Sequence, residues 1–538
     1  MQSLSSLSLC ITGLLTLSGI ACSCVAKPVT PGAPAATTPN PAQPVFQRAA
    51  ISPTNEVRGT WVTTTANEAI SNAANTAVSM KRLKDIGLNT VYVEVWKNGY
   101  TQFPSQTLQS IIGVDRRPNL MPQDPSDTPE RLKAPARDLL EETLIEAHRN
   151  GLIYNAWFEY GFMAAHKTTD NHLRRMKKEW LSLDKDGGEV APNGFVWMNP
   201  LHPETRKFLL DIVCEAVDKY DLDGVQLDDR IVWPYVTMGY DAYTKKIYAQ
   251  EHDGKEPPLD HTNAAWMRWR ADKVNEYGKI FVQEVRKRRP GLLISLSPAV
   301  YPWCYEYYLL EWPKWASWQT AILGNTARGP APATAWDEFI PQNYRFNFKA
   351  FEQTWLDQIK HINELGGGRV RDMLAGIRVV GDGPDSTWAD LKDSMNLVRT
   401  TGGGGSVHWF SRGVLDVFPK ELTDYYGKSG EASNPHFPAN WRMRSTVAMK
   451  MKPDATAKPP IGENMYEAQV SRSIPATYRM IVKRKGVWSF TDFTHIVAPL
   501  PPGQFQTTDL ARFTAPAPAD AEAVEFLIDR RPDMALRK

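Results

Sequence analysis

The sequence predicts an α/β protein: a (β/α)8 TIM barrel followed by a small C-terminal β-rich domain. Eight short strand patterns alternate with helix patterns over roughly 370 residues, which fits a closed parallel barrel better than an open sheet. No GxGxxG or GxxxxGK[ST] loop follows any strand, which argues against a nucleotide-binding fold. The predicted strands cover residues 57–63, 90–96, 152–160, 224–228, 292–297, 339–344, 373–379 and 406–410.

The segments between these strands have apolar side chains at helical spacing. Glycines at 366–368 and 402–405 follow helix patterns and are expected to end those helices. The clearest apolar helix face consists of Leu209, Ile212, Val213, Ala216 and Val217.

The pattern changes after about residue 426, where Pro and Ala become frequent. Residues 477–490 alternate in polarity around Lys485-Gly486, which is typical of a β-hairpin. We therefore assign residues 49–425 to the barrel and residues 426–538 to the β-rich domain.

The N-terminus is expected to direct export. Residues 4–21 are uncharged and mostly apolar, which is typical of a secretory leader, although no Lys or Arg precedes Lys27. We assign residues 1–26 to this leader; both a lipid anchor at Cys22 and a soluble secreted form are open. Residues 27–48 form a proline-rich, semi-rigid linker. The predicted location is the cell envelope, either periplasmic or lipid-anchored.

The composition excludes several classes of protein. With 62 Lys+Arg against 60 Asp+Glu, nothing indicates a nucleic-acid partner. Outside the leader only Cys214 and Cys304 occur, so neither a disulfide scaffold nor a CxxC metal site is expected. The 18 Trp, 19 Tyr and 19 Phe fit a large core and also a cleft in which sugar rings stack on aromatic rings.

Strand register predicts which side chains face the barrel lumen, because alternate residues point inward and outward. Three neighbouring strands then end in inward carboxylates, Glu94, Glu159 and Asp228. They are expected at the C-terminal mouth, where barrel enzymes carry their chemistry. A single buried acid could simply pair with an arginine, but three that converge beside tryptophans favour a catalytic site.

Two carboxylates that flank a glycosidic bond suit its hydrolysis, since one protonates the leaving oxygen and the other attacks or activates water. A serine hydrolase is disfavoured because no GxSxG motif is present. A metal-dependent polysaccharide deacetylase remains an alternative. Its metal ligands would be Asp228, Asp229, His202 and His408.

The chain resembles the glycosyl-hydrolase-like 10 family of bacterial envelope proteins, which is related to barrel hydrolases that act on peptidoglycan glycan strands. The family's paired aspartates correspond to Asp228 and Asp229. Two positions depart from its pattern: Arg230 stands where His or Tyr often follows, and Glu311 where Asp is usual. The resemblance is carried by blocks at residues 56–61, 88–94, 157–163, 197–203, 220–229, 239–241, 266–272, 295–298 and 341–345.

The predicted function is hydrolysis of an envelope glycan, with peptidoglycan strands as the implied substrate and no metal or cofactor. Asp228 is expected to be ionised, its pKa lowered by Arg230, and to act as nucleophile or base. Glu159, protonated by aromatic surroundings, would be the acid, with Glu94 as the alternative. The other rival is a non-catalytic glycan-binding or wall-tethering barrel. Expected substrate-binding residues are Asp229, Asp241, Arg58, Trp61, Trp157, Trp303, Gln342, Tyr344 and Trp409.

Overall fold

The computed structural model describes residues 54–120, 136–318, 334–428, 430–437, 445–471, 476–497 and 510–529. The predicted leader and linker, including Cys22, lie outside the described residues. Within those residues, no helix has the length and apolar character needed to cross a membrane.

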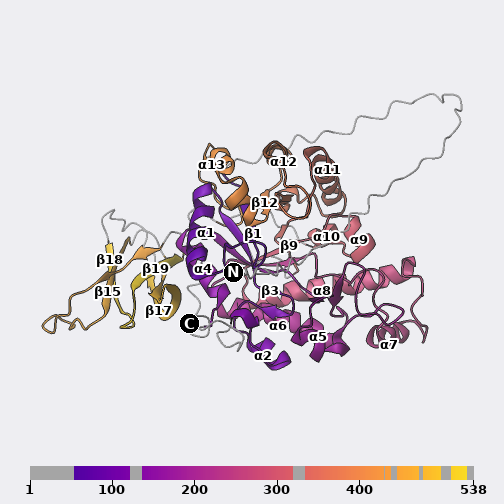
Figure 1. Cartoon of the computed structure of the whole chain (residues 1–538), viewed down its shortest axis with the longest axis horizontal. Coiled ribbons are helices and arrows are strands. Elements are labelled where there is room, and N and C mark those ends of the chain that lie inside the picture. Colours follow the sequence, from indigo (N-terminus) through magenta and orange to yellow (C-terminus); the bar gives the residue numbers. More distant parts are fainter. Residues whose placement is uncertain are drawn as a thin grey trace, which may run out of the picture.

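Eight parallel strands form a closed barrel at the centre of the molecule (Figure 1). Each strand pairs with the next along the chain, and the last pairs with the first. The bridges Phe339↔Met373 and Gln342↔Gly376 join the sixth and seventh strands and complete the closure. The predicted barrel is therefore confirmed. Its strands are β1 (Val57–Val62), β2 (Thr90–Glu94), β5 (Ile153–Phe158), β8 (Gly224–Asp228), β9 (Leu293–Ser297), β10 (Glu338–Phe339), β11 (Ala375–Arg378) and β12 (Gly405–Trp409).

A helix follows each barrel strand before the next begins. Local sequence fixes their ends: Asn72 caps the first helix, and Gly87, with φ 107°, ends it. Gly366 caps α11 as predicted, whereas α12 is capped at Thr401, just before the predicted glycines. The helices are α1 (Ala73–Ile86), α4 (Leu139–Arg149), α6 (Pro203–Lys219), α8 (Ala264–Arg288), α10 (Trp312–Ala316), α11 (Phe348–Leu365), α12 (Trp388–Thr400) and α13 (Pro419–Gly427).

The loops after β2, β5, β8 and β9 carry small elements of their own at the C-terminal end of the barrel. These are β3 (Trp96–Lys97), β4 (Tyr100–Thr101), α2 (Gln106–Ile112), β6 (Met163–His166), α5 (His172–Met176), β7 (Phe195–Trp197), α7 (Ala242–Glu251) and α9 (Trp303–Tyr308). Single helical turns occur at Pro118–Leu120, Lys178–Trp180, Val370–Asp372 and Gly413–Val417.

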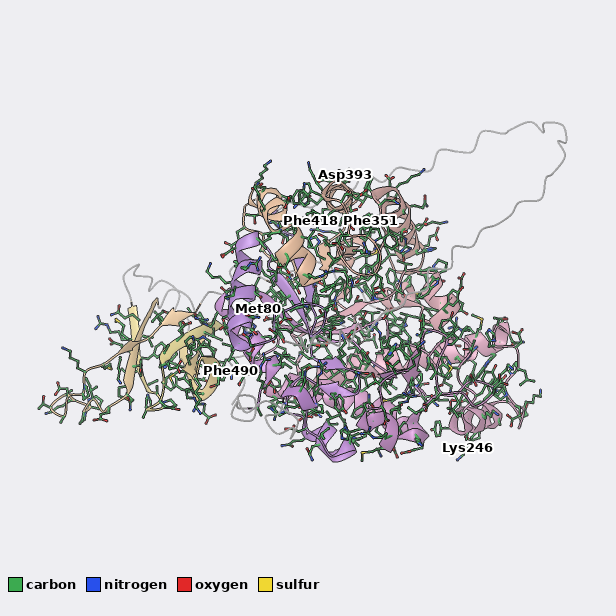
Figure 2. All side chains as sticks on the ribbon, in the orientation of Figure 1. Met80, Lys246, Phe351, Asp393, Phe418 and Phe490 are labelled. Carbon is green, nitrogen blue, oxygen red and sulfur yellow. The ribbon has the colours of Figure 1, made fainter. Side chains whose placement is uncertain are left out.

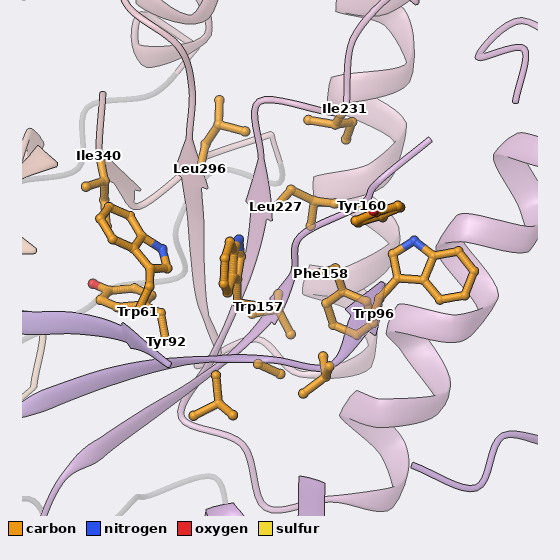
Figure 3. Packing of buried hydrophobic residues seen from close by; sticks show 14 of the residues in the cluster. Trp61, Tyr92, Trp96, Trp157, Phe158, Tyr160, Leu227, Ile231, Leu296 and Ile340 are labelled. Atoms are coloured by element: carbon orange, nitrogen blue, oxygen red, sulfur yellow. The ribbon is translucent and has the colours of Figure 1, made fainter. Parts of the chain in front are cut away.

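A chain of hydrogen bonds crosses the barrel lumen. Trp61 Nε1 donates to Gln226 Oε1 at 2.8 Å, and Gln226 Nε2 donates to Ser295 Oγ at 2.9 Å. Ser295 Oγ and the Tyr92 hydroxyl both donate to Glu338 Oε1, at 2.7 and 2.8 Å. Figure 3 shows Trp61 and Tyr92 side by side in this interior. Tyr92 and Gln226 therefore face the lumen, two residues before the predicted inward acids Glu94 and Asp228 on the same strands.

The C-terminal strands form two small antiparallel sheets, with orders β13-β19-β16-β17 and β14-β15-β18. The predicted hairpin is β16–β17, whose turn residues Lys485 and Gly486 have positive φ of 50° and 78°. The strands are β13 (Thr446–Val447), β14 (Met449–Lys450), β15 (Met465–Ser471), β16 (Ala476–Arg484), β17 (Val487–Val497), β18 (Leu510–Pro516) and β19 (Ala523–Asp529).

The β-rich domain is attached to helix α4, on the side of the barrel away from α7 (Figure 1). Ile145 of α4 packs with Trp488 and Leu527, and Phe490 lies at the same junction (Figure 2). Arg149 donates two hydrogen bonds to Glu525, at 2.9 and 2.8 Å. These contacts use the half of α4 that leads into β5, so the domain lies near the N-terminal end of the barrel.

Candidate active site

Acidic side chains gather at the C-terminal mouth around one guanidinium group. Arg230 Nη1 lies 2.7 Å from Asp228 Oδ2, 3.4 Å from Asp229 Oδ1 and 3.8 Å from Glu159 Oε1. Asp228 is the last residue of β8, and Glu159 directly follows β5. The neighbouring strands β5 and β8 therefore bring these acids together, as their register predicts.

A second cation, Lys97, joins the remaining acid to this group. Lys97 Nζ lies 2.8 Å from Glu94 Oε2 and 3.2 Å from Glu159 Oε2. Burial alone would lower the pKa of Lys97, but the attraction of Glu159 and Glu94 raises it above its ordinary value. We call Glu94, Lys97, Glu159, Asp228, Asp229 and Arg230 the mouth cluster.

Asp228 is held by four hydrogen-bond donors. Oδ2 accepts from Trp157 Nε1 at 3.1 Å and from Arg230 Nη1 at 2.7 Å. Oδ1 accepts from Gln342 Nε2 at 2.6 Å and from the Asp229 backbone N–H at 2.8 Å. Burial nevertheless raises the pKa of Asp228 well above its usual range, although Arg230 lowers it. The expected net depression of this pKa is therefore wrong.

Glu94 is enclosed in the same way. The Thr64 hydroxyl donates to its Oε1, and the Thr64 N–H and Lys97 Nζ reach its Oε2. Burial raises the pKa of Glu94, while Lys97 opposes the rise and Glu159 adds to it.

Asp229 and Glu159 retain unused hydrogen-bonding capacity. The Asp229 side chain is 23% exposed, and within the described residues its Oδ1 accepts no hydrogen bond. Glu159 Oε2 is buried and, although close to Lys97, receives no hydrogen bond of normal geometry from any described residue. Burial also raises the pKa of Asp229, against the effect of Arg230. Glu159 lies between two cations, so the expected aromatic surroundings are replaced by charged ones.

Among the aromatic residues expected to bind the substrate, Trp61 and Trp157 are 1% exposed. Their rings contact each other and Trp409, so neither offers a free face to a ligand. Trp409 and Tyr344 are half-buried and lie 5.6 Å apart, centroid to centroid. Gln342, through its bond to Asp228, also belongs to this site.

Trp303 lies on a separate aromatic surface beside the mouth cluster. Its ring centroid is 5.1 Å from that of Tyr307 and 5.4 Å from that of Tyr308, and Tyr235 is 5.6 Å from Tyr307. All four rings are half-buried. Burial, together with repulsion from Asp229, raises the pKa of Tyr308 above its ordinary value. We call Tyr235, Trp303, Tyr307 and Tyr308 the aromatic surface.

Two predicted substrate-binding residues lie elsewhere. Arg58 is buried near the start of β1, where Nε donates to Glu56 at 2.8 Å and the guanidinium lies over the Tyr426 ring. Trp61 faces the lumen, so Arg58, three residues earlier in the strand, faces the helices. Asp241 caps α7 and accepts hydrogen bonds from Thr244 and Asn199. Both positions are structural.

The ligands expected for a deacetylase metal do not come together. His202 caps α6 and its ring lies 4.6 Å from that of Tyr243, centroid to centroid, whereas His408 contacts the Tyr426 hydroxyl at 2.8 Å on the outer side of β12. Among the described residues, no group of three or more His, Cys, Asp or Glu side chains is arranged to hold a metal ion.

Sequence reasoning missed Lys97 and Thr64. Lys97 stands three residues after Glu94, immediately beyond a barrel strand, and Thr64 follows β1 in the same way. The position of a polar residue just after a strand end was the available signal, because that is where barrel loops face the site.

The sequence of the barrel matches a known family. Residues 56–322, from just before β1 to just beyond α10, match the family described as Glycosyl hydrolase-like 10. The resemblance to this family that the sequence motifs indicate is therefore confirmed for residues 56–322. The matched segment contains every member of the mouth cluster.

Two relatives similar in sequence to this chain are named glycosyl hydrolases. Glycosyl hydrolase DigH of Escherichia coli (strain K12) is 24% identical over 379 residues, 64% of this chain and 73% of DigH. Glycosyl hydrolase YngK of Bacillus subtilis (strain 168) is 24% identical over 263 residues, 45% of each chain. The match therefore spans less than half the length of YngK.

Solved structures with a similar arrangement are remote. The PgaB (BpsB) glycoside hydrolase domain from Bordetella bronchiseptica aligns with a TM-score of 0.49 and 13% identity, over 69% of this chain and 98% of that domain. The β-amylase catalytic domain from Paenibacillus polymyxa aligns with a TM-score of 0.45 and 10% identity, over 71% of this chain and 100% of that domain.

Proposed function

We propose that this protein is a glycoside hydrolase that cleaves an envelope glycan, with peptidoglycan glycan strands as substrate. One observation carries the proposal: Asp228, Asp229 and Glu159 all lie within 4 Å of Arg230 Nη1 at the barrel mouth. The match to the glycosyl hydrolase-like 10 family supports the same reaction class.

The spacing of these acids suits a two-carboxylate mechanism. Because all three acids lie close to Arg230 Nη1, the oxygen of either aspartate is no farther from the Glu159 oxygen than the sum of their two distances to that nitrogen. Both sums are below roughly 9.5 Å, the largest separation between the two carboxyl groups of inverting glycoside hydrolases. Glu159 would then protonate the leaving oxygen, while an aspartate of the Asp228–Asp229 pair attacks the anomeric carbon or activates water. This division of roles is part of the proposal.

The aromatic surface supports a polymeric substrate. Its half-buried rings lie on the loops after β8 and β9, at the same end of the barrel as Asp229, where further sugar rings of a long strand could pack. The predicted leader and linker agree with work on an envelope glycan, so we propose export to the periplasm or anchoring at Cys22.

The rival function is glycan binding without catalysis. A pure binding protein gains nothing from buried acids whose oxygens are left without hydrogen bonds, because such groups cost free energy. The unused oxygens of Asp229 and Glu159 therefore favour the hydrolase.

Digestion of peptide-free peptidoglycan strands tests the proposal. Wild-type protein is expected to release short oligosaccharides, detectable by mass spectrometry, and Asp228→Asn is expected to release none. Glu276→Gln, an exposed acid on α8, is the matched control and should behave as wild type. Strand binding without product from the wild type would support the binding protein instead.

A further inference from the structure

We propose that Asp229, rather than Asp228, is the carboxylate that meets the reacting sugar, and that Asp228 is a positioning residue. The inference rests on the proposed hydrolase function and assigns roles within it. It contrasts with the expectation from sequence, which places Asp228 at the anomeric carbon.

Asp228 has little capacity left for a substrate. A carboxylate offers about four lone-pair sites, and four donors occupy those of Asp228, at 2.6 to 3.1 Å. Its side chain is 3% exposed. A sugar carbon or water could approach Asp228 only by displacing Trp157, Gln342, Arg230 or the Asp229 N–H, and each displacement loses a hydrogen bond to a charged group.

Asp229 differs in each of these respects. Its side chain is the most exposed acid of the mouth cluster, and its closest charged partner, Arg230 Nη1, lies at 3.4 Å. Its Oδ1 is itself buried and accepts no hydrogen bond within the described part of the chain, so the exposure of the side chain comes from its other atoms. Its negative charge adds to burial in raising the pKa values of Tyr308 and Tyr344. Asp229 is therefore the mouth-cluster acid that combines an exposed side chain with an electrostatic effect on Tyr308 of the aromatic surface.

Asp228 fixes how Asp229 is presented. Asp228 Oδ1 accepts the Asp229 N–H at 2.8 Å, which sets the backbone of Asp229 at the end of β8. Asp228 Oδ2 accepts from Arg230 Nη1, the same nitrogen that faces Asp229 and Glu159. One buried carboxylate thus orients both the neighbouring acid and the cation that they share.

The chemical step then involves Asp229 and Glu159. The Asp229 carboxylate attacks the anomeric carbon, or removes a proton from a water that attacks it. The glycosidic C–O bond breaks with its electron pair, and Glu159 gives its proton to the leaving oxygen. In the first case water later cleaves the sugar–Asp229 ester and returns a proton to Glu159, so both carboxyl groups are restored.

Azide rescue of two adjacent alanine variants distinguishes the roles. Asp229→Ala and Asp228→Ala should both digest glycan strands poorly. Added azide should give a glycosyl azide with Asp229→Ala, because the small anion takes the place of the missing carboxylate at the anomeric carbon. Asp228→Ala should give none. A glycosyl azide from Asp228→Ala, or from neither variant, would overturn the assignment.

A second measurement needs no activity and separates this inference from the hydrolase proposal. Wild-type protein is treated with a carbodiimide and glycinamide, and the modified residues are mapped by mass spectrometry. Within the mouth cluster Asp229 should react before the other acids, and Asp228 should stay unmodified in the folded protein. Modification of Asp228 before Asp229 would refute the inference even if no glycan is cleaved. Asp228→Asn, which keeps the side-chain volume, replaces Asp228→Ala if the alanine variant does not fold.

Discussion

Two buried charged clusters lie at opposite ends of the same barrel, and they are satisfied to different degrees. At the N-terminal end, Glu56 Oε1 accepts from Arg58 Nε and its Oε2 accepts from Arg399 Nε, both at 2.8 Å. Tyr426 lies beneath the Arg58 guanidinium, 4.6 Å away. We call Glu56, Arg58, Arg399 and Tyr426 the end-wall cluster.

The end-wall cluster has one acid for two arginines, whereas the mouth cluster has four acids for two cations. Glu56 has a guanidinium partner at each oxygen, but Asp229 and Glu159 each leave one oxygen without a hydrogen bond. Burial is similar in the two places, so burial alone does not mark a functional acid. The unused hydrogen-bonding capacity does.

Glu159→Gln gives the largest expected effect and tests the mouth side of the comparison. Removing the general acid should lower kcat on glycan strands by roughly 10²–10⁴-fold. The midpoint of thermal unfolding should change little, because Glu159 lacks a full set of partners. A variant that keeps its activity would contradict a catalytic mouth cluster.

Glu56→Gln tests the opposite end. Loss of this acid removes the carboxylate that pairs with the buried Arg58 and the half-buried Arg399, which should lower the free energy of unfolding by roughly 3–5 kcal/mol. Denaturant titration measures the loss, and kcat at low temperature should stay near the wild-type value. A large fall in kcat without loss of stability would abolish the distinction between the clusters.

His408, which is hydrogen-bonded to Tyr426, should make the folded protein less stable at acid pH. Burial lowers the pKa of His408 to about 4 in the folded protein, from about 6.5 when unfolded. The unfolded chain therefore binds the extra proton between these values. The contribution of the neutral His408 to the free energy of unfolding should be fully present above about pH 6.5, and this free energy should fall by roughly 3 kcal/mol as the pH drops toward 4. Unfolding of His408→Gln should show a shallower pH dependence; an unchanged slope would refute the role of His408.

Arg230→Gln should shift the acid limb of the pH profile of activity. Arg230 lowers the pKa of Asp228 and Asp229, so its removal raises both. If the ionised aspartate is required, the acid limb of kcat/KM should move to higher pH by roughly 1 unit. Arg230→Lys keeps the charge and should leave the limb near its wild-type position. Movement to lower pH would mean that Arg230 acts in another way.

Trp303→Ala gives the smallest expected effect and tests the aromatic surface. Loss of one stacking ring should weaken binding of long oligosaccharides by roughly 0.5–1.5 kcal/mol, measured as a rise in KM. Short oligosaccharides that do not reach the aromatic surface should show no change. An equal rise for both lengths would place Trp303 at the reacting sugar or in the core.

Much of the fold follows from local sequence patterns. All eight strands, the helix ends at Gly87 and Gly366, and the Lys485-Gly486 hairpin were predictable, because strand alternation, helical spacing and glycines at helix ends and turns act within a few residues. The inward register also placed Glu94, Glu159 and Asp228 at one mouth. Arg58 stands three residues before the inward-facing Trp61 on the same strand, so the same alternation would have predicted that Arg58 faces away from the lumen.

Only the tertiary structure decided how those acids differ. Trp157, Gln342 and Lys97 come from other strands or loops than Asp228, so their hydrogen bonds and charges depend on closure of the barrel and not on neighbouring sequence. The sequence alone determined that buried acids converge in a TIM barrel that resembles the glycosyl hydrolase-like 10 family. Which oxygens are occupied and which remain open to a substrate depends on long-range packing, because each partner is supplied by a different part of the chain.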